Sequence, residues 1–380
     1  MVRGSRKFDH GSGDGFTPTH RCFYNNRCYW FLVMPLKILS PLSRIDEVEP
    51  LIDAGADEFY CGVLPAEWRE KYSVAACLNR RQEDNTFINT SPHMSSFADL
   101  EEAVRRSHRR NIPVVLTINE HYYSREQYPC LREYIEQALQ SGIDAFIIGD
   151  PGILFTLQEM GSPARIHIST AATAFNAETV HFYRDLGAAR VILPRHLSLE
   201  EIGGIAQKVS GVELETFILN SRCANVDGLC TFQHGLADLV DEENRKSYEN
   251  ACMLLYEISA AVEGVPDEEA EKILQEKISW ERQHFWSALH IDDRPCGGCA
   301  LYEFEEMGLA GVKIVGRDNA PEKKLKDVLF IQRLLTNLRE ARPSKKAFRE
   351  YTRELYKEEY KWPCLIFKCY YPSVLMDGET

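Results

Sequence analysis

The chain has 380 residues, of which 44% are hydrophobic, and its formal net charge is −13 at pH 7. That hydrophobic fraction is enough for a packed core and excludes a wholly disordered chain. The negative charge excludes a protein that coats nucleic acid non-specifically, although a local basic groove remains compatible with it.

Residues 1–33 differ from the rest of the chain, because they are polar and glycine-rich and end in a short apolar run, Cys28–Val33. This run is far shorter than the roughly 20 residues that cross a membrane. We therefore expect a loose N-terminal extension, no signal peptide and no membrane span. The twelve cysteines are too dilute for a disulfide scaffold, so a reducing, cytoplasmic location is expected.

Short runs rich in Val, Ile, Leu and Phe follow from residue 36 onward, as is typical of buried parallel strands. The predicted strands are 36–40, 58–63, 113–119, 145–149, 165–169, 190–194, 212–219 and 311–316. Helices of about 10–15 residues are predicted between most of them. Three spacings typical of capping boxes support helix starts. They are Ser43-x-x-Asp46, Ser96-x-x-Asp99 and Ser198-x-x-Glu201.

Glycine stands shortly before several predicted strands, at Gly55, Gly142, Gly187 and Gly308. Because glycine readily ends a helix in the left-handed conformation, each position predicts a return from helix to strand. Repeated βα units with about eight strands predict an α/β fold, a (β/α)8 TIM-barrel-like domain. A doubly wound open sheet is the alternative that periodicity does not exclude.

The regular pattern is interrupted between residues 220 and 300, which we interpret as a cysteine-bearing insertion above the strand ends. A charged stretch within it predicts a helix over about 240–285. Further helices are predicted over 320–341 and 344–361, and the tail from residue 362 is left unassigned. The predicted organisation is an extension over 1–33, a barrel domain over 34–341, and a C-terminal helix and tail over 342–380.

Five cysteines of the C-terminal half carry the chemistry that the residues indicate: Cys223, Cys230, Cys252, Cys296 and Cys299. Glycine or proline stands near several of them, so their loops can bend thiolates toward one centre. Four thiolates suit a [4Fe-4S] cluster or a closed tetrahedral zinc site. The alternatives are reduced cysteines that fill the core and a redox dithiol at Cys296 and Cys299.

The segment from Glu215-Thr-Phe217 to Cys223, followed by Gly228-Leu-Cys230, resembles the signature of the peptidase U32 family of collagenase-like proteins. Further blocks in the same order are similar to that family: Ala54–Gly62, Asp150–Gly152, Arg195–Ser198 and Lys313–Arg317. The resemblance covers about residues 36–340.

The resemblance implies an α/β barrel with a [4Fe-4S] cluster that supports oxygen-independent hydroxylation. The implied substrates are a quinone-type small molecule or a base in transfer or ribosomal RNA. The implied cluster ligands are Cys223, Cys230, Cys252 and Cys296, and Cys299 is an alternative to Cys296.

Glu215 and Arg195 are predicted to position substrate or act on it, and a structural ion pair is the alternative for each. His167 is predicted to be a hydrogen-bonded core histidine. The sequence has no Ser/His/Asp motif, no His-Glu-x-x-His and no P-loop. The second hypothesis, a peptidase, would therefore depend on a zinc-bound water. The third is a non-catalytic partner of a paralogous U32-like protein.

Overall fold

The computed structural model describes residues 35–72, 78–80, 91–220, 223, 226–230, 295–365 and 368–376, and a few short segments outside those ranges. The chain divides into two compact units, Met1–Pro35 and Leu36–Thr380. In the first unit, the two-residue strands β1 (Arg21–Cys22) and β2 (Cys28–Tyr29) pair antiparallel. The second unit contains the barrel.

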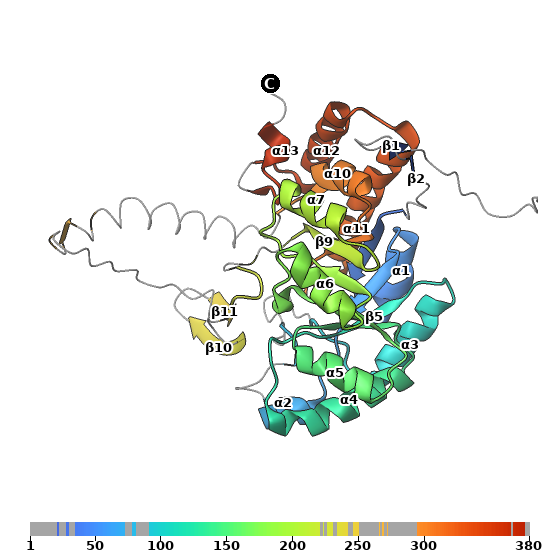
Figure 1. The fold of residues 1–380 in the computed structure, drawn as a ribbon, viewed down its shortest axis with the longest axis vertical. Coiled ribbons are helices and arrows are strands. Elements are labelled where there is room, and N and C mark those ends of the chain that lie inside the picture. Colours follow the sequence, from blue (N-terminus) through green and yellow to red (C-terminus); the bar gives the residue numbers. More distant parts are fainter. Residues whose placement is uncertain are drawn as a thin grey trace, which may run out of the picture. The chain divides into compact units, whose positions relative to one another are not determined.

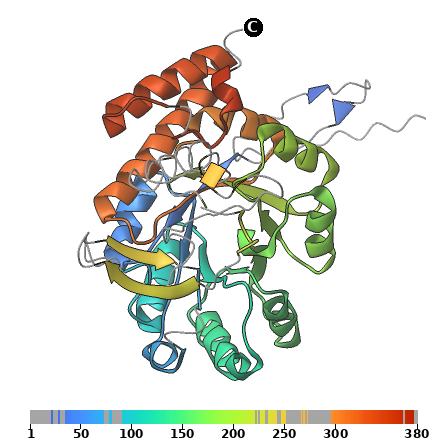
Figure 2. The same ribbon diagram turned by 90° about the vertical axis from the view of Figure 1, so that its left-hand side faces the viewer.

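Eight parallel strands close into a barrel in the second unit (Figure 2). They are β3 (Lys37–Pro41), β4 (Glu58–Cys61), β5 (Val114–Ile118), β6 (Ala145–Ile148), β7 (Arg165–Ile168), β8 (Arg190–Ile192), β9 (Glu213–Leu219) and β12 (Gly311–Ile314). The barrel closes at β12, where Gly311 pairs with Lys37 on one side and with Glu215 on the other. All eight predicted strands are confirmed, and the closure excludes the doubly wound sheet.

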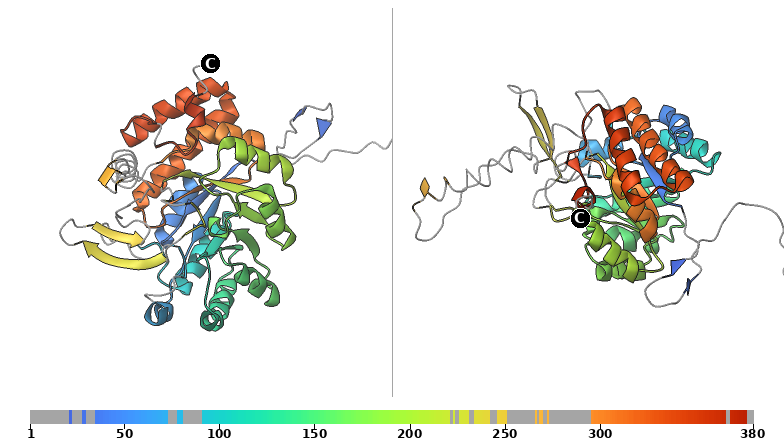
Figure 3. Two further views of the ribbon diagram at one scale, coloured as in Figure 1. Left: turned by 60° about the vertical axis from the view of Figure 1, so that its left-hand side comes forward. Right: turned by 90° about the horizontal axis from the view of Figure 1, so that it is seen from above.

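Helices lie between the strands and cover the outside of the barrel (Figure 1). They are α1 (Val48–Asp53), α2 (Ala66–Tyr72), α3 (Phe97–His108), α4 (Tyr128–Gln140), α5 (Pro151–Glu159), α6 (Ala177–Asp185), α7 (Leu199–Lys208), α10 (Leu301–Met307), α11 (Pro321–Thr336), α12 (Lys345–Tyr360) and α13 (Ser373–Met376). A π-helical turn over Asn337–Ala341 extends α11, and α12 packs against α11 (Figure 3). No helix within the described part of the chain is both long and apolar enough to cross a membrane.

Two of the three predicted helix caps are confirmed. The Ser96 hydroxyl accepts a hydrogen bond from the Asp99 N–H at 3.1 Å, and Ser198 forms a full capping box with Glu201. The four predicted return glycines all have positive φ, between 73° and 104°. Helix ends and strand starts therefore follow local sequence signals closely in the barrel.

The predicted cap at Ser43 and Asp46 is wrong, because a neighbouring acid takes that role. The Glu47 carboxylate accepts the Ser43 N–H at 3.0 Å and also binds the Lys324 ammonium at 2.9 and 3.0 Å. Lys324 is fully buried on α11 and donates to the Ser43 hydroxyl at 2.7 Å as well. This ion pair therefore attaches the loop after β3 to α11.

An ion-pair network centred on the buried Arg190 and Glu58 lies at the N-terminal end of the barrel. We call it the floor network, and its members are each the first residue of a strand: Lys37, Glu58, Arg165, Arg190 and Glu213. Arg190 is 1% exposed and pairs with Glu58 at 2.5 Å and with Glu213 at 2.7 Å. Lys37 pairs with Glu58, and Arg165 with Glu213. Each charge has an opposite partner, as buried charges require.

The helix predicted over 240–285 is wrong in its first part. Strands β10 (His234–Asp241) and β11 (Lys246–Asn250) pair there as an antiparallel hairpin. Charged residues without clear periodicity do not distinguish helix from strand, and pairing across the turn decides the structure. Most of the remaining segment, with Cys252, lies outside the described residues.

Candidate functional site

The C-terminal ends of the barrel strands carry a cluster of polar side chains, which we call the mouth cluster. Its members are Arg80, Asn119, Thr170, Arg195 and Asp227. Arg80 precedes α3, and the other four follow β5, β7, β8 and β9 in turn. Residues far apart in the chain therefore meet at the end of the barrel where α/β-barrel proteins carry their chemistry.

Asp227 is the buried centre of the mouth cluster. One of its carboxylate oxygens accepts the backbone N–H of Arg195 at 2.9 Å and the side-chain Nε–H at 3.0 Å. The other oxygen lies 3.6 Å from the Arg80 guanidinium. Burial opposes ionisation, but Arg195 and then Arg80 outweigh it and lower the pKa of Asp227 to about 2. Two guanidinium groups thus face one carboxylate.

A close backbone approach holds Asp227 in this place. Gly228 has a φ of +81°, and a Cβ there would come within 2.5 Å of the Thr170 carbonyl oxygen. Only glycine therefore lets the 226–230 loop pack against the 3-10 turn Thr170–Ala172. The glycine of the Cys223–Cys230 segment thus positions a carboxylate as well as two cysteines.

Cys223 and Cys230 are both half-buried next to mouth residues. Cys230 contacts His121, which follows β5. Burial disfavours the charged imidazole, but Cys230 and Glu120 together raise the pKa of His121 to about 9. Cys223 lies within electrostatic reach of Arg195. The loop after β9 therefore brings the two cysteines to the ends of different strands, β5 and β8.

Cys296 reaches the same end of the barrel from another segment. It forms an isolated antiparallel bridge with Leu219, the last residue of β9, and a parallel bridge with Cys369 of the C-terminal tail. Burial raises the pKa of the Cys296 thiol, and the nearby Cys299, Cys369 and Cys364 add to this effect. Cys296 thus has three cysteine neighbours. Cys299 is the predicted alternative ligand, whereas the sequence predicts no role for Cys364 and Cys369.

The described residues do not by themselves complete a metal or cluster site. Their thiols have the right chemistry and come from segments that meet near the end of β9. However, no three His, Cys, Asp or Glu side chains within the described ranges are arranged to hold an ion. Cys252, the remaining implied ligand, is outside those ranges. The four-cysteine ligand set therefore stays a prediction.

Glu215 lies in the barrel interior. It is fully buried, and one carboxylate oxygen accepts a hydrogen bond from Arg190 at 2.9 Å. The other oxygen has no hydrogen-bond partner among the described atoms. Burial raises the pKa of Glu215, while Arg190 and Lys313 oppose that rise. One oxygen of Glu215 therefore forms the structural ion pair that was the predicted alternative, and the other oxygen lacks a protein partner in the described structure.

His167 is also a barrel-interior residue, as predicted, but it is not hydrogen-bonded. Neither ring nitrogen has a partner within the described part of the structure, and the side chain is buried. Burial, followed by the charge of Arg190, lowers the pKa of His167 well below its usual value. The imidazole is therefore neutral at physiological pH.

Two further basic side chains lie beside the mouth cluster, on and after β12. The Arg317 guanidinium donates to the Thr117 hydroxyl at 2.8 Å. The Lys313 ammonium nitrogen lies 4.0 Å from the centre of the Tyr60 ring. Arg317 thus adds a third guanidinium group to those of Arg80 and Arg195 at this end of the barrel.

Sequence reasoning missed Asp227, Arg80 and Lys313 as site residues. Asp227 had a signal, since it stands inside the Cys223–Cys230 segment, and Lys313 stands in one of the resembling blocks. Arg80 had none, because it comes from a loop without motif or periodicity.

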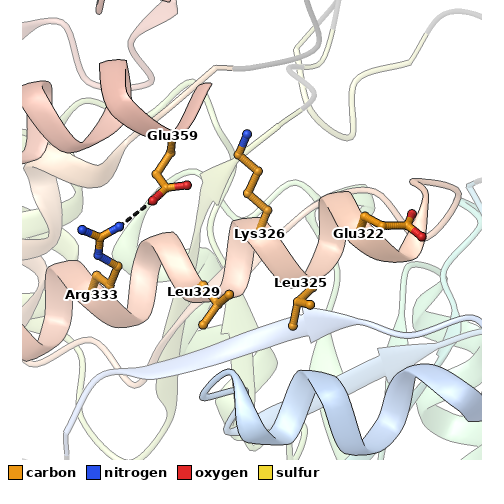
Figure 4. Close-up of a pocket in the computed structure, with 6 residues that line it drawn as sticks. All are labelled: Glu322, Leu325, Lys326, Leu329, Arg333 and Glu359. Carbon is orange, nitrogen blue, oxygen red and sulfur yellow. Dashed lines mark hydrogen bonds and ion pairs between the residues drawn. The ribbon is translucent and has the colours of Figure 1, made fainter. Parts of the chain in front are cut away.

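A groove on the outside of the barrel contains none of the predicted site residues. It is lined by residues of α11 and by Glu359 of α12: Glu322, Leu325, Lys326, Leu329, Arg333 and Glu359 (Figure 4). An ion pair between Arg333 and Glu359 at 2.5 Å crosses it. Its mixed charges partly neutralise each other, so it is a weaker candidate than the mouth.

The sequence of the barrel chain matches a known family. The sequence profile of Peptidase family U32 matches residues 43–368. The chain therefore belongs to Peptidase family U32.

Three curated relatives are informative. The chain is 27% identical over 227 residues to tRNA hydroxylation protein P of Escherichia coli K12, a match that covers 60% of this chain and 45% of that protein. It is 27% identical over 247 residues to the 23S rRNA 5-hydroxycytidine C2501 synthase of the same organism, covering 65% and 33%. An uncharacterized protease of Methanocaldococcus jannaschii is 28% identical over 203 residues, covering 52% and 44%.

The chain matches less than half the length of each of these three relatives. A solved structure of a U32 peptidase aligns with 16% identity and a TM-score of 0.39, covering 74% of this chain and 93% of that one.

Proposed function

We propose that this protein is an enzyme that hydroxylates an RNA base, with the barrel mouth as its substrate site. Relatives that carry RNA hydroxylation names support the reaction class. The observation that carries the site assignment is the convergence of Arg80 and Arg195 on Asp227 at the strand ends. Guanidinium groups held in a fixed orientation are suited to bind phosphate groups and base edges. Because the whole chain is negatively charged, such local positive groups are needed to bind RNA.

Two arginines with fixed side chains form the substrate-binding part of the proposed site. Arg195 is held by Asp227 and lies over the Phe217 ring, 4.4 Å from its centre, so its guanidinium has a fixed plane. Arg317 is similarly fixed by Thr117. These residues bind and orient an anionic substrate.

The cofactor is a separate part of the proposal. Cys223, Cys230, Cys252 and Cys296 would hold a [4Fe-4S] cluster, with Cys299 as the alternative to Cys296, and such a cluster would supply electron transfer. A zinc ion bound by the same thiols is the alternative.

Iron, zinc and acid-labile sulfide per chain test the cofactor in protein purified without oxygen. We expect iron and sulfide in the wild type and their loss in Cys223→Ser and Cys230→Ser. Cys130→Ser is the matched control, because Cys130 contacts Tyr72 and Lys71 and is not one of the implied ligands. Wild-type protein with zinc and no iron after reconstitution would contradict the cluster.

Nucleoside mass spectrometry of cellular RNA tests the reaction. Cells that lack this protein should lose a hydroxylated pyrimidine nucleoside, and the wild-type chain should restore it. Arg195→Gln should not restore it. Arg333→Gln, which removes an exposed arginine of α11, should restore it fully. An unchanged nucleoside profile in the deletion strain would refute the RNA assignment, and cleavage of denatured collagen by the purified chain would favour the peptidase alternative.

A further inference from the structure

Lys313 is an unusual lysine because it is buried in the barrel without an acidic partner. It is the third residue of β12 and only 6% of its surface is exposed. Its amine lies 4.0 Å from the centre of the Tyr60 ring. No carboxylate within the described part of the chain lies within ion-pair distance of it. An aromatic face alone compensates little of the cost of burying a charged amine.

The groups that surround Lys313 disfavour its protonation. Burial is the largest effect and lowers the pKa of Lys313, and Arg317, Arg190 and Arg195 lower it further. Glu215 acts in the opposite direction, although its carboxylate is also bound by Arg190. The pKa of Lys313 is therefore lowered to about 7, so a substantial fraction of the amine is neutral near physiological pH and has a free electron pair.

Lys324 provides the comparison within the same chain. It is equally buried, but it binds both oxygens of Glu47 and the Ser43 hydroxyl. Its surroundings are those of a structural ion pair. Lys313 has the burial without the pairing, at the strand end where barrel proteins carry reactive groups.

We propose that the Lys313 amine is a nucleophile that captures a small aldehyde or ketone bearing a negative charge. The nitrogen electron pair attacks the carbonyl carbon, the two N–H protons pass to the carbonyl oxygen, and the C–O bond breaks as that oxygen leaves as water. The product is an imine, and the step requires no oxidant or reductant. The nearby arginines, Arg195 and Arg317, supply the positive charge that favours an anionic carbonyl compound. This inference does not depend on RNA being the substrate.

Reductive trapping on the native full-length protein tests the proposal. Glyoxylate is the probe, cyanoborohydride reduces any imine at pH 7, and peptide mass spectrometry measures the modified fraction of each lysine. We expect Lys313 to be modified at least ten-fold faster than the exposed Lys208 and the buried, paired Lys324. Modification of Lys313 no faster than that of Lys208 would overturn the proposal. This result is independent of any RNA assay.

Two matched measurements sharpen the test. Lys313→Arg keeps a cation but removes the reactive amine, so the fast-modified site should vanish without a new one appearing. Fast modification elsewhere in this variant would show that Lys313 was not the nucleophile. Acetaldehyde, which has no charge, should modify Lys313 more slowly than glyoxylate, relative to Lys208. Equal or faster modification by acetaldehyde would refute the preference for an anionic compound.

Discussion

The barrel contains two sets of buried polar groups that differ in how completely they are paired. At the N-terminal end, Lys37, Glu58, Arg165, Arg190 and Glu213 pair with one another, so each charge of the floor network has an opposite partner. Toward the mouth, buried groups are left partly or wholly unpaired. One oxygen of Glu215 and both ring nitrogens of His167 lack a hydrogen-bond partner in the described structure. The Lys313 amine lies over the Tyr60 ring and forms no ion pair among the described residues.

We interpret the paired charges as structural and the unpaired buried groups as functional. Fully paired buried charges add little net stability, but breaking a pair is costly. Unpaired buried groups cost stability from the start, so their retention indicates a use that stability does not explain. The comparison predicts large stability effects at the floor network and small ones at the unpaired groups.

The largest effect is expected from Arg190→Met. The substitution leaves Glu58 and Glu215 buried without their guanidinium partner. Loss of one partner from a buried ion pair costs about 3–5 kcal/mol. Urea unfolding followed by circular dichroism should show this loss of free energy. Stability within about 1 kcal/mol of the wild type would mean that the floor network is not structural.

The second comparison uses the same substitution at two buried lysines. Lys324→Met leaves the buried Glu47 carboxylate without its lysine partner and should lower the free energy of unfolding by about 3 kcal/mol or more. Lys313→Met removes an amine without an acidic partner within ion-pair distance and should be neutral or slightly stabilising, by up to about 1 kcal/mol. Unfolding of the two variants under identical conditions measures the difference. Equal losses would contradict the distinction between paired and unpaired lysines.

A smaller effect is expected from pH at the mouth cluster. The pKa of Asp227 is about 2 in the folded protein, against an unfolded value of about 3.9. A lowered folded pKa stabilises the protein above the unfolded value, and this contribution is lost as pH falls from about 4 toward 2. The shift corresponds to about 2.5 kcal/mol at most.

The Asp227→Asn variant isolates this contribution. Its free energy of unfolding should lie below that of the wild type at pH 6, and the gap should narrow at pH 3. A gap that does not change with pH would show that Arg195 and Arg80 do not stabilise the ionised carboxylate.

Much of the barrel could be predicted from local sequence signals. Apolar runs located all eight strands, and the helix-ending glycines marked several returns between helix and strand. The predicted (β/α)8 barrel is confirmed, but periodicity alone could not exclude an open sheet, because closure depends on the pairing of Gly311 with Lys37 from opposite ends of the domain. The β10–β11 hairpin was misread as helix, since its charged residues have no decisive period.

The candidate site was predicted less completely. Arg195 was correctly placed at a strand end, but its partner Asp227 depends on a loop that packs through Gly228 against Thr170. Arg80 reaches the mouth from a loop without any pattern. The unpaired state of Lys313 depends on which side chains converge from β4, β8 and β9, and no spacing along the chain encodes that convergence.

The most direct test of the account asks whether an unpaired mouth residue is needed for function rather than for folding. RNA hydroxylation should be measured by nucleoside mass spectrometry in cells whose only copy of the protein is Lys313→Met. The account predicts that the hydroxylated nucleoside falls to the level of the deletion strain, while the purified variant unfolds at the wild-type temperature or above it. Wild-type levels of the hydroxylated nucleoside in these cells would contradict it.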